Sequence, residues 1–280
     1  MSEEGSRAEE TRLGRRFAEI KKEGRTGLVT FITAGDPDVE ISTRILRGLP
    51  QAGADIIELG MPFSDPMADG PAIQAASQRA LRSGATLRIT LAMARVFRRE
   101  DRDTPLILMG YYNPIHRYGV RKFLDEALDA GVDGLIIVDL PPEEDDELCH
   151  PCLTAGMHWI RLTTPTTDAA RLARVLENAS GFVYHVAIAG ITGTASAEKA
   201  EIQNAVAELR KHTDLPIAVG FGIKTADQAS DIAGAADAVV VGSALIDRIA
   251  SGVENKAERD EIISSVHGFV SKLAIGLRKE

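Results

Sequence analysis

Apolar residues follow two different spacings along the chain. Short runs rich in β-branched residues predict buried strands, and longer segments with apolar positions three or four residues apart predict amphipathic helices. Eight strands are predicted, at 27–34, 55–60, 105–112, 134–140, 158–163, 181–187, 216–220 and 238–242. Helices are predicted after them, at 39–52, 72–96, 120–130, 143–155, 169–178, 197–212, 226–233 and 257–276.

Two of these helices contain residues that disfavour a continuous helix. The pair Ser83-Gly84 is expected to split the segment 72–96, and Pro151 is expected to break or kink the segment 143–155.

The repeat of strand and helix determines the predicted fold class. Eight strands joined by returns long enough for right-handed crossovers are typical of an α/β protein with a (β/α)8 TIM barrel, and an open doubly wound sheet is the alternative. No linker rich in proline, glycine and serine divides the chain, so residues 1–280 are expected to form one domain. Residues 1–10 are expected to be a polar extension, and residues 13–22 an extra N-terminal helix ahead of the barrel.

The second predicted strand ends in an acidic side chain. Because side chains alternate, Ile56 and Glu58 share one face of this strand, and Ile57 and Leu59 share the other. Two largely apolar faces are typical of a strand in a parallel sheet. Burial there raises the pKa of Glu58 towards the working pH, where the group can give and take protons. Acceptance of a backbone hydrogen bond is the alternative role, but the cost of burying a carboxyl group favours function.

The turn after this strand contains two more carboxylates. Pro62 and Pro66, with glycines at both ends, shape the turn so that Asp65 and Asp69 come back over the strand end. Three acids are therefore expected at one mouth. For Asp65, capping of a turn or a helix is an equally good interpretation.

Polar groups follow several of the other predicted strands. In a (β/α)8 barrel, catalytic groups lie at the carboxyl ends of the strands. Read in order, these ends carry Asp36, Glu58, Tyr111, Asp139 and Tyr184. They are expected to face one rim.

Glycine-rich turns end the last two strands. Gly222 and Gly242 let the main chain approach an anion, and a short helix beginning at Ser243 adds N–H groups and a favourable dipole. These features predict a site for a phosphorylated small molecule, to which Gly193 adds a third contact. Tight packing of each turn is the alternative. Lys224 is interpreted as a solvated loop residue rather than a Schiff-base lysine.

Composition and charge narrow the class of protein. Lys and Arg number 32 and Asp and Glu 41, and the net charge of −9 argues against nucleic-acid or anionic-membrane binding. No apolar run approaches the roughly 18 residues of a membrane-spanning helix, and the first residues resemble no targeting segment, so a cytoplasmic protein is expected. The six histidines are not at ligand spacing, so no metal is expected. Cys149 and Cys152 are interpreted as two thiols in a reducing compartment.

These residues resemble one family, the alpha subunit of tryptophan synthase. The matching motifs lie in the family's order and spacing from about Phe17 onwards, at 31–37, 58–70, 111–114, 139–141, 190–193, 220–223 and 242–244. The acidic run at 58–70 is highly specific, whereas the glycine turns alone are not.

The resemblance implies a barrel that reversibly cleaves indole-3-glycerol phosphate into indole and glyceraldehyde 3-phosphate, without a cofactor of its own. By position, Glu58 matches the family's catalytic acid/base and Asp69 its second catalytic carboxylate. The other matches are the indole pocket at Phe31, Tyr111 and Tyr184, the mobile loop over the active site at Thr192, and the phosphate site at Gly193, Gly222, Gly242 and Ser243.

The resemblance also implies a partner. The family's alpha subunit works in an alpha2-beta2 complex, whose beta subunit carries pyridoxal phosphate and condenses indole with L-serine to L-tryptophan. Pro62 and Asp65 would then belong to the contact surface. The chain departs from the family pattern at Ala187, where a serine is usual, at Pro151 and in its longer N-terminal extension, but none of these changes removes a catalytic group.

Two other functions compete with this interpretation. A phosphoribosyl or triose isomerase on the same barrel would share the phosphate turns, but it would not need Phe31 and Tyr111 around an indole-sized pocket. A non-catalytic activator of the beta subunit would be expected to lack Glu58 or Asp69, and both are present.

Overall fold

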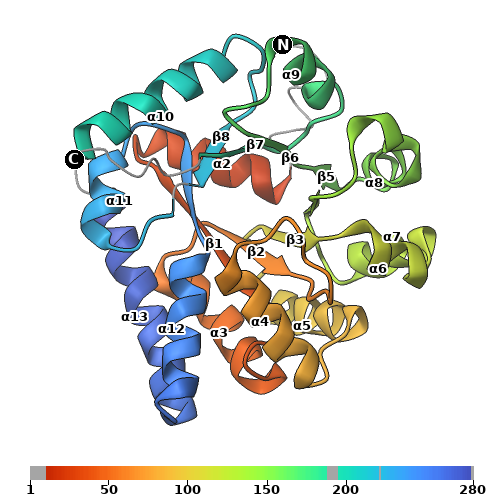
Figure 1. The fold of residues 1–280 in the computed structure, drawn as a ribbon, viewed down its shortest axis with the longest axis vertical. Coiled ribbons are helices and arrows are strands. Elements are labelled where there is room, and N and C mark those ends of the chain that lie inside the picture. Colours follow the sequence, from red (N-terminus) through yellow and green to blue (C-terminus); the bar gives the residue numbers. More distant parts are fainter. Residues whose placement is uncertain (1–10, 188–194, 221, 279–280) are drawn as a thin grey trace.

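The strands of the chain form one parallel sheet, in the order β5-β4-β3-β2-β1-β9-β8-β7-β6. This computed structural model describes residues 11–187, 195–220 and 222–278 (Figure 1). The strands are β1 (Gly27–Thr33), β2 (Ile56–Gly60), β3 (Leu106–Gly110), β4 (Gly134–Ile137), β5 (His158–Trp159), β6 (Arg161–Thr163), β7 (Val183–Val186), β8 (Ile217–Gly220) and β9 (Ala238–Val241).

The predicted fifth strand is divided into β5 and β6. β5 pairs with β4, and β6 pairs with β7. Between them, the N–H of Ile160 donates to the carbonyl of Leu135 at 3.0 Å. The two short strands are therefore successive parts of one element that joins the ends of the sheet. The result is a nearly closed barrel, so the (β/α)8 prediction is confirmed and the open sheet is wrong.

Helices form an outer layer around the strands (Figure 1). In chain order they are α3 (Val39–Ala52), α4 (Pro71–Arg82), α5 (Leu87–Glu100), α6 (Tyr112–Tyr118), α7 (Val120–Asp129), the 3-10 helix η1 (Pro142–Glu147), α8 (Cys149–Thr154), α9 (Ala169–Leu176), α10 (Ala195–Leu209), α11 (Ala226–Ile232), α12 (Ser243–Glu254) and α13 (Arg259–Arg278).

Three helix boundaries have identifiable physical causes. The predicted split after α4 is confirmed, since Ser83 ends that helix. The predicted extension of the third strand to residue 112 is wrong: α6 begins at Tyr112, whose N–H donates to the Asp139 carboxylate at 2.8 Å. The segment 143–155 breaks at Leu148, and Pro151 lies in the first turn of α8, where its missing N–H is not needed.

The interior of the barrel is closed at its amino end by the extra helix α2 (Arg12–Lys22), as expected. Leu13, Phe17 and Ile20 are buried and pack with inward-facing strand residues such as Val29 and Ile56. A second, larger apolar cluster lies between the outer face of the strands and the helices. The strands are therefore covered on both faces, which explains their nearly continuous apolar sequences.

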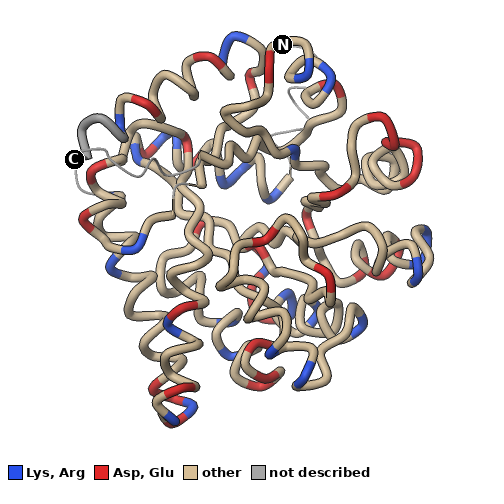
Figure 2. The backbone as a smooth tube through the Cα atoms, in the orientation of Figure 1, with Lys and Arg blue, Asp and Glu red and all other residues tan. Residues whose placement is uncertain are grey.

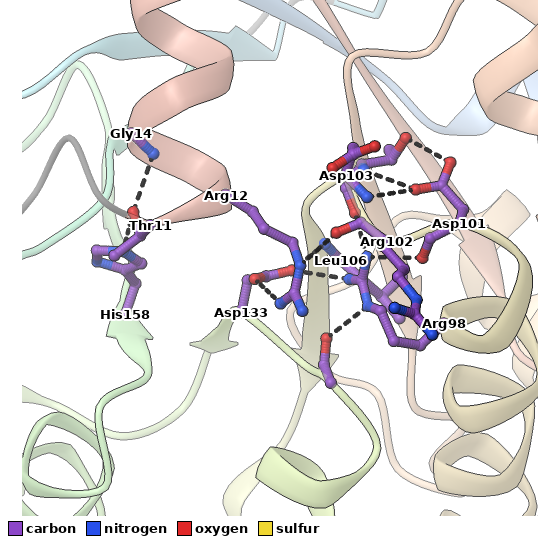
Figure 3. Close-up of polar contacts among 12 residues, drawn as sticks. Thr11, Arg12, Gly14, Arg98, Asp101, Arg102, Asp103, Leu106, Asp133 and His158 are labelled. Atoms are coloured by element: carbon purple, nitrogen blue, oxygen red, sulfur yellow. Dashed lines mark hydrogen bonds and ion pairs between the residues drawn. The ribbon is translucent and has the colours of Figure 1, made fainter.

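Asp133, in the turn before β4, attaches α2 to the barrel (Figure 3). Its carboxylate accepts hydrogen bonds from Arg12 at 2.8 Å and from Arg98 at 2.9 Å, and so ties α2 to α5. On the other side of α2, the hydroxyl of Thr11 lies 3.1 Å from Nε2 of His158 (Figure 3). The amino end of the barrel is thus held by polar contacts as well as by apolar packing.

Charged residues belong mainly to peripheral segments of the backbone, and acidic residues gather on η1 (Figure 2). Basic residues are scattered over several elements rather than collected on one face (Figure 2). Among the helices of the described residues, none has both the length and the apolar character needed to cross a membrane.

Candidate active site

Glu58 lies on β2 with its side chain in the barrel interior. It shares this face with Ile56, a member of the interior cluster, and it is paired in register with Phe31 on β1. Only 1% of Glu58 is exposed, and its Oε1 has no hydrogen-bond partner among the described residues. Burial raises the pKa of Glu58 from 4.5 to about 8. At neutral pH the Glu58 carboxyl group is therefore protonated, and no described residue holds its Oε1 by a hydrogen bond.

Tyr184 faces the same interior from β7. Burial, and then the nearby charge of Glu58, raise the pKa of its phenol, so Tyr184 remains a neutral hydrogen-bond donor. Its ring lies against Gly220 of the neighbouring strand β8. A Cβ at that glycine would lie 2.5 Å from the Tyr184 hydroxyl, which leaves no room for a larger residue.

Asp69 reaches the mouth from the turn between β2 and α4, as predicted. Burial raises the pKa of Asp69 from 3.8 to about 6, although a hydrogen bond from Tyr111 partly opposes this shift. The hydroxyl of Tyr111 also accepts a hydrogen bond from the N–H of Ala68 at 3.0 Å. The Phe63 ring contacts Tyr111, with centroids 5.2 Å apart. Tyr111 therefore positions the turn that carries Asp69.

The cavity beside these groups has a volume of about 10 Å3, which is room for about one water molecule. Phe31, Asp69 and Tyr111 line it, and the Phe31 ring occupies the space above Gly60, where a Cβ would lie 2.6 Å from Cζ. An indole ring would need Phe31 or its neighbours to move.

Most residues that line this cavity were not identified as site residues from the sequence. They include Thr33, Met61, Ser77 and Met109. Thr33 is two positions beyond Phe31 on the same face of β1, so alternation along that strand contains the signal that would have found it. Its buried hydroxyl has no hydrogen-bond partner among the described residues.

Two acids expected at the rim have structural partners. Asp36 is 1% exposed and forms a bidentate ion pair with Arg79 of α4, at 2.7 and 2.9 Å. Asp139 is exposed and accepts the N–H of Tyr112. Asp36 thus fixes α4 after the acidic turn, and Asp139 fixes the start of α6 next to Tyr111.

The predicted phosphate turns lie on neighbouring strands. Gly220 of β8 is paired in register with Val240 of β9, so the turns at Gly222 and Gly242 emerge side by side. Gly222 has a φ of +66°, which favours glycine, and Gly242 precedes α12, whose first residue, Ser243, is exposed. The first N–H groups of that helix have no intrahelical partner. Thr192 and Gly193 lie outside the described residues.

The turn between β2 and α4 also has an outward side. Asp65 is exposed there, and Met67 is the most exposed of the large hydrophobic residues, at 78%. Pro62, by contrast, is buried.

Two other expectations concern metals and thiols. Within the described ranges, no group of three or more His, Cys, Asp or Glu residues could hold a metal ion. Cys149 and Cys152 are buried free thiols, and burial raises the pKa of both, that of Cys149 to about 12. Neither has the low thiol pKa of a redox centre.

The fold is a (β/α)8 barrel, a class of enzymes whose catalytic groups lie at the carboxyl ends of the strands. The carboxyl groups of Glu58 and Asp69, both of raised pKa, are suited to acid–base chemistry. The family model for the tryptophan synthase alpha chain matches residues 17–273. The chain therefore belongs to the tryptophan synthase alpha chain family, and it is a lyase that cleaves indole-3-glycerol phosphate.

Solved structures agree with this assignment. Tryptophan synthase subunit alpha from Legionella pneumophila str. Paris is 38% identical, covers 95% of this chain and 98% of its own, and superposes with a TM-score of 0.87. Tryptophan synthase from M. tuberculosis in space group F222 is 33% identical, with 96% and 99% coverage and a TM-score of 0.85. A ligand-free mutant form of the M. tuberculosis protein is 33% identical, with 96% and 100% coverage and a TM-score of 0.84.

Proposed function

We propose that Glu58 is the acid–base residue of the cleavage and that Asp69 is the carboxylate that binds the indole N–H. The observation that supports this assignment most strongly is the buried carboxyl group of Glu58, whose Oε1 has no hydrogen-bond partner among the described residues and whose pKa burial raises to about 8. A protonated acid in an apolar barrel is suited to proton transfer to carbon near neutral pH.

The proton transfers then balance over one cycle. The protonated Glu58 gives its proton to C3 of the indole ring, and positive charge develops on the ring nitrogen. Anionic Asp69 stabilises that charge through the N–H. The Glu58 carboxylate next removes the proton of the adjacent hydroxyl group, the carbon–carbon bond breaks, and indole and glyceraldehyde 3-phosphate leave. Glu58 is protonated again at the end.

The remaining predicted residues bind the two ends of the substrate. Phe31, Tyr111 and Tyr184 surround the ring, and Thr192 closes over it. The N–H groups at Gly222, Gly242 and Ser243, with Gly193, bind the phosphate. The turns after β8 and β9 lie side by side, which supports separate binding positions for the ring and the phosphate. A phosphate at these turns would be one strand away from Phe31 on β1 and two strands away from Glu58 on β2.

Measurement of indole formation from indole-3-glycerol phosphate tests these roles. Glu58→Gln keeps the size of the side chain and removes its proton transfer, so a loss of at least about a hundredfold in kcat is expected. Asp69→Asn is expected to lower kcat as well. Asp125→Asn, at an exposed position of α7, is the control. Equal kcat for Glu58→Gln and the unmodified chain, with both folded by circular dichroism, would contradict the proposal.

The same proposal includes a partner and a compartment. The acidic turn, with the exposed Asp65 and the nearby Pro62, contacts a beta subunit in an alpha2-beta2 complex, and pyridoxal phosphate is bound by that subunit. The chain itself uses no cofactor and acts as one domain. Two buried free thiols support a reducing cytoplasm. Addition of a beta subunit is expected to raise the rate of indole formation strongly, and an unchanged rate would argue against the complex.

A further inference from the structure

A second cavity, of about 250 Å3, lies outside the barrel between the strands β6 and β7 and the helices α9 and α10. Its strand residues include Thr163 and His185. His185 follows Tyr184 directly on β7, so the two side chains point to opposite faces of the sheet. The cavity and the candidate active site are therefore back to back and share no lining residue.

His185 is a buried polar side chain in the wall of this cavity. It is 4% exposed, and its Nδ1 lies 3.1 Å from the hydroxyl oxygen of Thr163. Its Nε2 is buried and has no hydrogen-bond partner among the described residues. A buried ring nitrogen without a partner is costly, and few such groups occur in native proteins. Burial also lowers the pKa of His185, so the ring is neutral.

The rest of the cavity has apolar walls, two further threonines, Thr164 and Thr167, and an acidic rim. Buried walls come from Leu172, Ile202 and Leu209, and exposed carboxylates come from Glu201 and Glu208. Glu208 is ion-paired with Lys211, so it is chiefly the carboxylate of Glu201 at the entrance that disfavours an anionic ligand such as the phosphorylated substrate. A neutral apolar molecule meets no such barrier.

We propose that this cavity binds a small neutral aromatic molecule that carries one N–H or O–H group and makes a hydrogen bond with Nε2 of His185. An apolar cavity of about 150 Å3 holds benzene, so this one accommodates one or two rings. The Thr163 hydroxyl can accept from Nδ1 or donate to it, so Nε2 is available as acceptor or donor. Phenols and indole, the product of the cleavage, belong to this class.

The test uses 4-fluorophenol as the probe and the full chain labelled with 15N at histidine. Saturable binding is expected, with a shift of the ring nitrogens of His185. Ala205→Phe fills the cavity from α10 and is expected to abolish that binding. The matched control is Ala207→Phe, at an exposed position of the same helix, which is expected to leave binding unchanged. His185→Phe keeps the aromatic wall, and its binding is followed by the 19F signal of the probe. The loss of one hydrogen bond is expected to weaken binding about tenfold.

Two results would overturn the proposal. One is the absence of any saturable change in the His185 resonances up to the solubility limit of the probe. The other is equal binding of 4-fluorophenol by Ala205→Phe and the unmodified chain, which would place the probe elsewhere, for instance inside the barrel. Indole formation by Ala205→Phe, which touches no group of the candidate active site, confirms that this variant is folded.

Discussion

Glu58 and Asp69 show how the position of a carboxyl group sets its chemistry. Glu58 lies within a strand and has lost nearly all contact with solvent, whereas Asp69 lies in a turn and keeps a hydrogen bond from Tyr111. Burial therefore raises the pKa of Glu58 to about 8 and that of Asp69 only to about 6. Between these two values the first group is an acid and the second is an anion, which is the pairing that the proposed cleavage needs.

This pairing predicts a bell-shaped pH profile. For kcat/KM of indole formation, activity is expected to rise as Asp69 ionises near pH 6 and to fall as Glu58 loses its proton near pH 8. Asp69→Asn removes the ionisation of the acidic limb. A profile for that variant with the same rise near pH 6 would show that another group titrates there.

The raised pKa of Glu58 also predicts a change in stability. The folded state keeps the Glu58 proton up to about pH 8, while the unfolded chain releases it near 4.5, so its stabilising contribution is full below pH 4.5 and is lost as pH rises through 8. Glu58→Gln stays neutral throughout. The quantity to measure by calorimetry is the unfolding midpoint of Glu58→Gln minus that of the unmodified chain. This difference is expected to be larger at pH 8.5 than at pH 5.5, by about 4 °C or more. Equal differences at the two pH values would mean that Glu58 is ionised in the folded protein.

Tyr184 depends on a residue that it touches across the sheet. A Cβ at Gly220 would lie 2.5 Å from the Tyr184 hydroxyl and 2.8 Å from its ring, so Gly220→Ala is expected to displace the phenol. Because Tyr184 is one wall of the proposed ring pocket, a rise in KM of about tenfold is expected in the cleavage assay. Gly268→Ala, on α13, where a Cβ meets no atom within 4 Å, is the control for the added methyl group.

At the scale of elements, α2 stabilises the barrel from the end opposite to the mouth. Leu13 is fully buried against the barrel interior, so Leu13→Ala is expected to cost about 2–5 kcal/mol and to lower the unfolding midpoint by about 5 °C or more. Lys21→Ala, at an exposed position of the same helix, is expected to leave the midpoint within about 1 °C. If both variants unfold together with the unmodified chain, α2 does not contribute to the core.

An element could be predicted from the sequence when the signals that set its start and end lie within it or directly beside it in the chain. α3 has the predicted bounds because Asp38 caps its start and Gly53 its end, and both signals are local. α6 could not be predicted from its own residues, because the acid that receives the Tyr112 N–H is Asp139, in the turn after β4. The division at Ile160 has the same origin, since it depends on the partners of β5 and β6.

For the candidate site, the positions of the acids could be predicted from the sequence, but the role of each acid could not. Glu58 and Asp69 could be singled out because carboxylates beside apolar strands are unusual, and burial raises the pKa of both in the structure. Asp36 carries the same sequence signal, yet it is held by Arg79, which is distant in the chain. Only the folded contacts distinguish a reactive acid from a structural one.

At the scale of the whole molecule, one side of the acidic turn faces the barrel cavity and the other side faces the surrounding water. Asp69 faces the cavity, and Asp65 and Met67 face outwards. Any partner that covers Met67 would therefore restrict the turn that also positions Asp69, and this provides a physical route for the proposed beta subunit to affect cleavage.

A charge reversal on this surface tests the route. Asp65→Lys is expected to weaken association with a beta subunit about tenfold by calorimetric titration, because it reverses a charge at the rim of the contact. The unfolding midpoint of the isolated chain should not change, since Asp65 is exposed. Asp125→Lys, exposed on α7, is the matched control. Equal affinity for both variants would place the contact elsewhere.

The small size of the cavity at Phe31 bears on how long each ligand stays. If the ring pocket is mostly closed, the apparent affinity of every ligand falls by the fraction of molecules that are open, and each 1.4 kcal/mol in favour of closure is a tenfold loss. Indole-3-glycerol phosphate can offset that loss with its phosphate, whereas indole, once cut from the phosphate, has only its ring. Relaxation of Phe31 over Gly60 would then expel the product, so the resting shape of the barrel itself favours release.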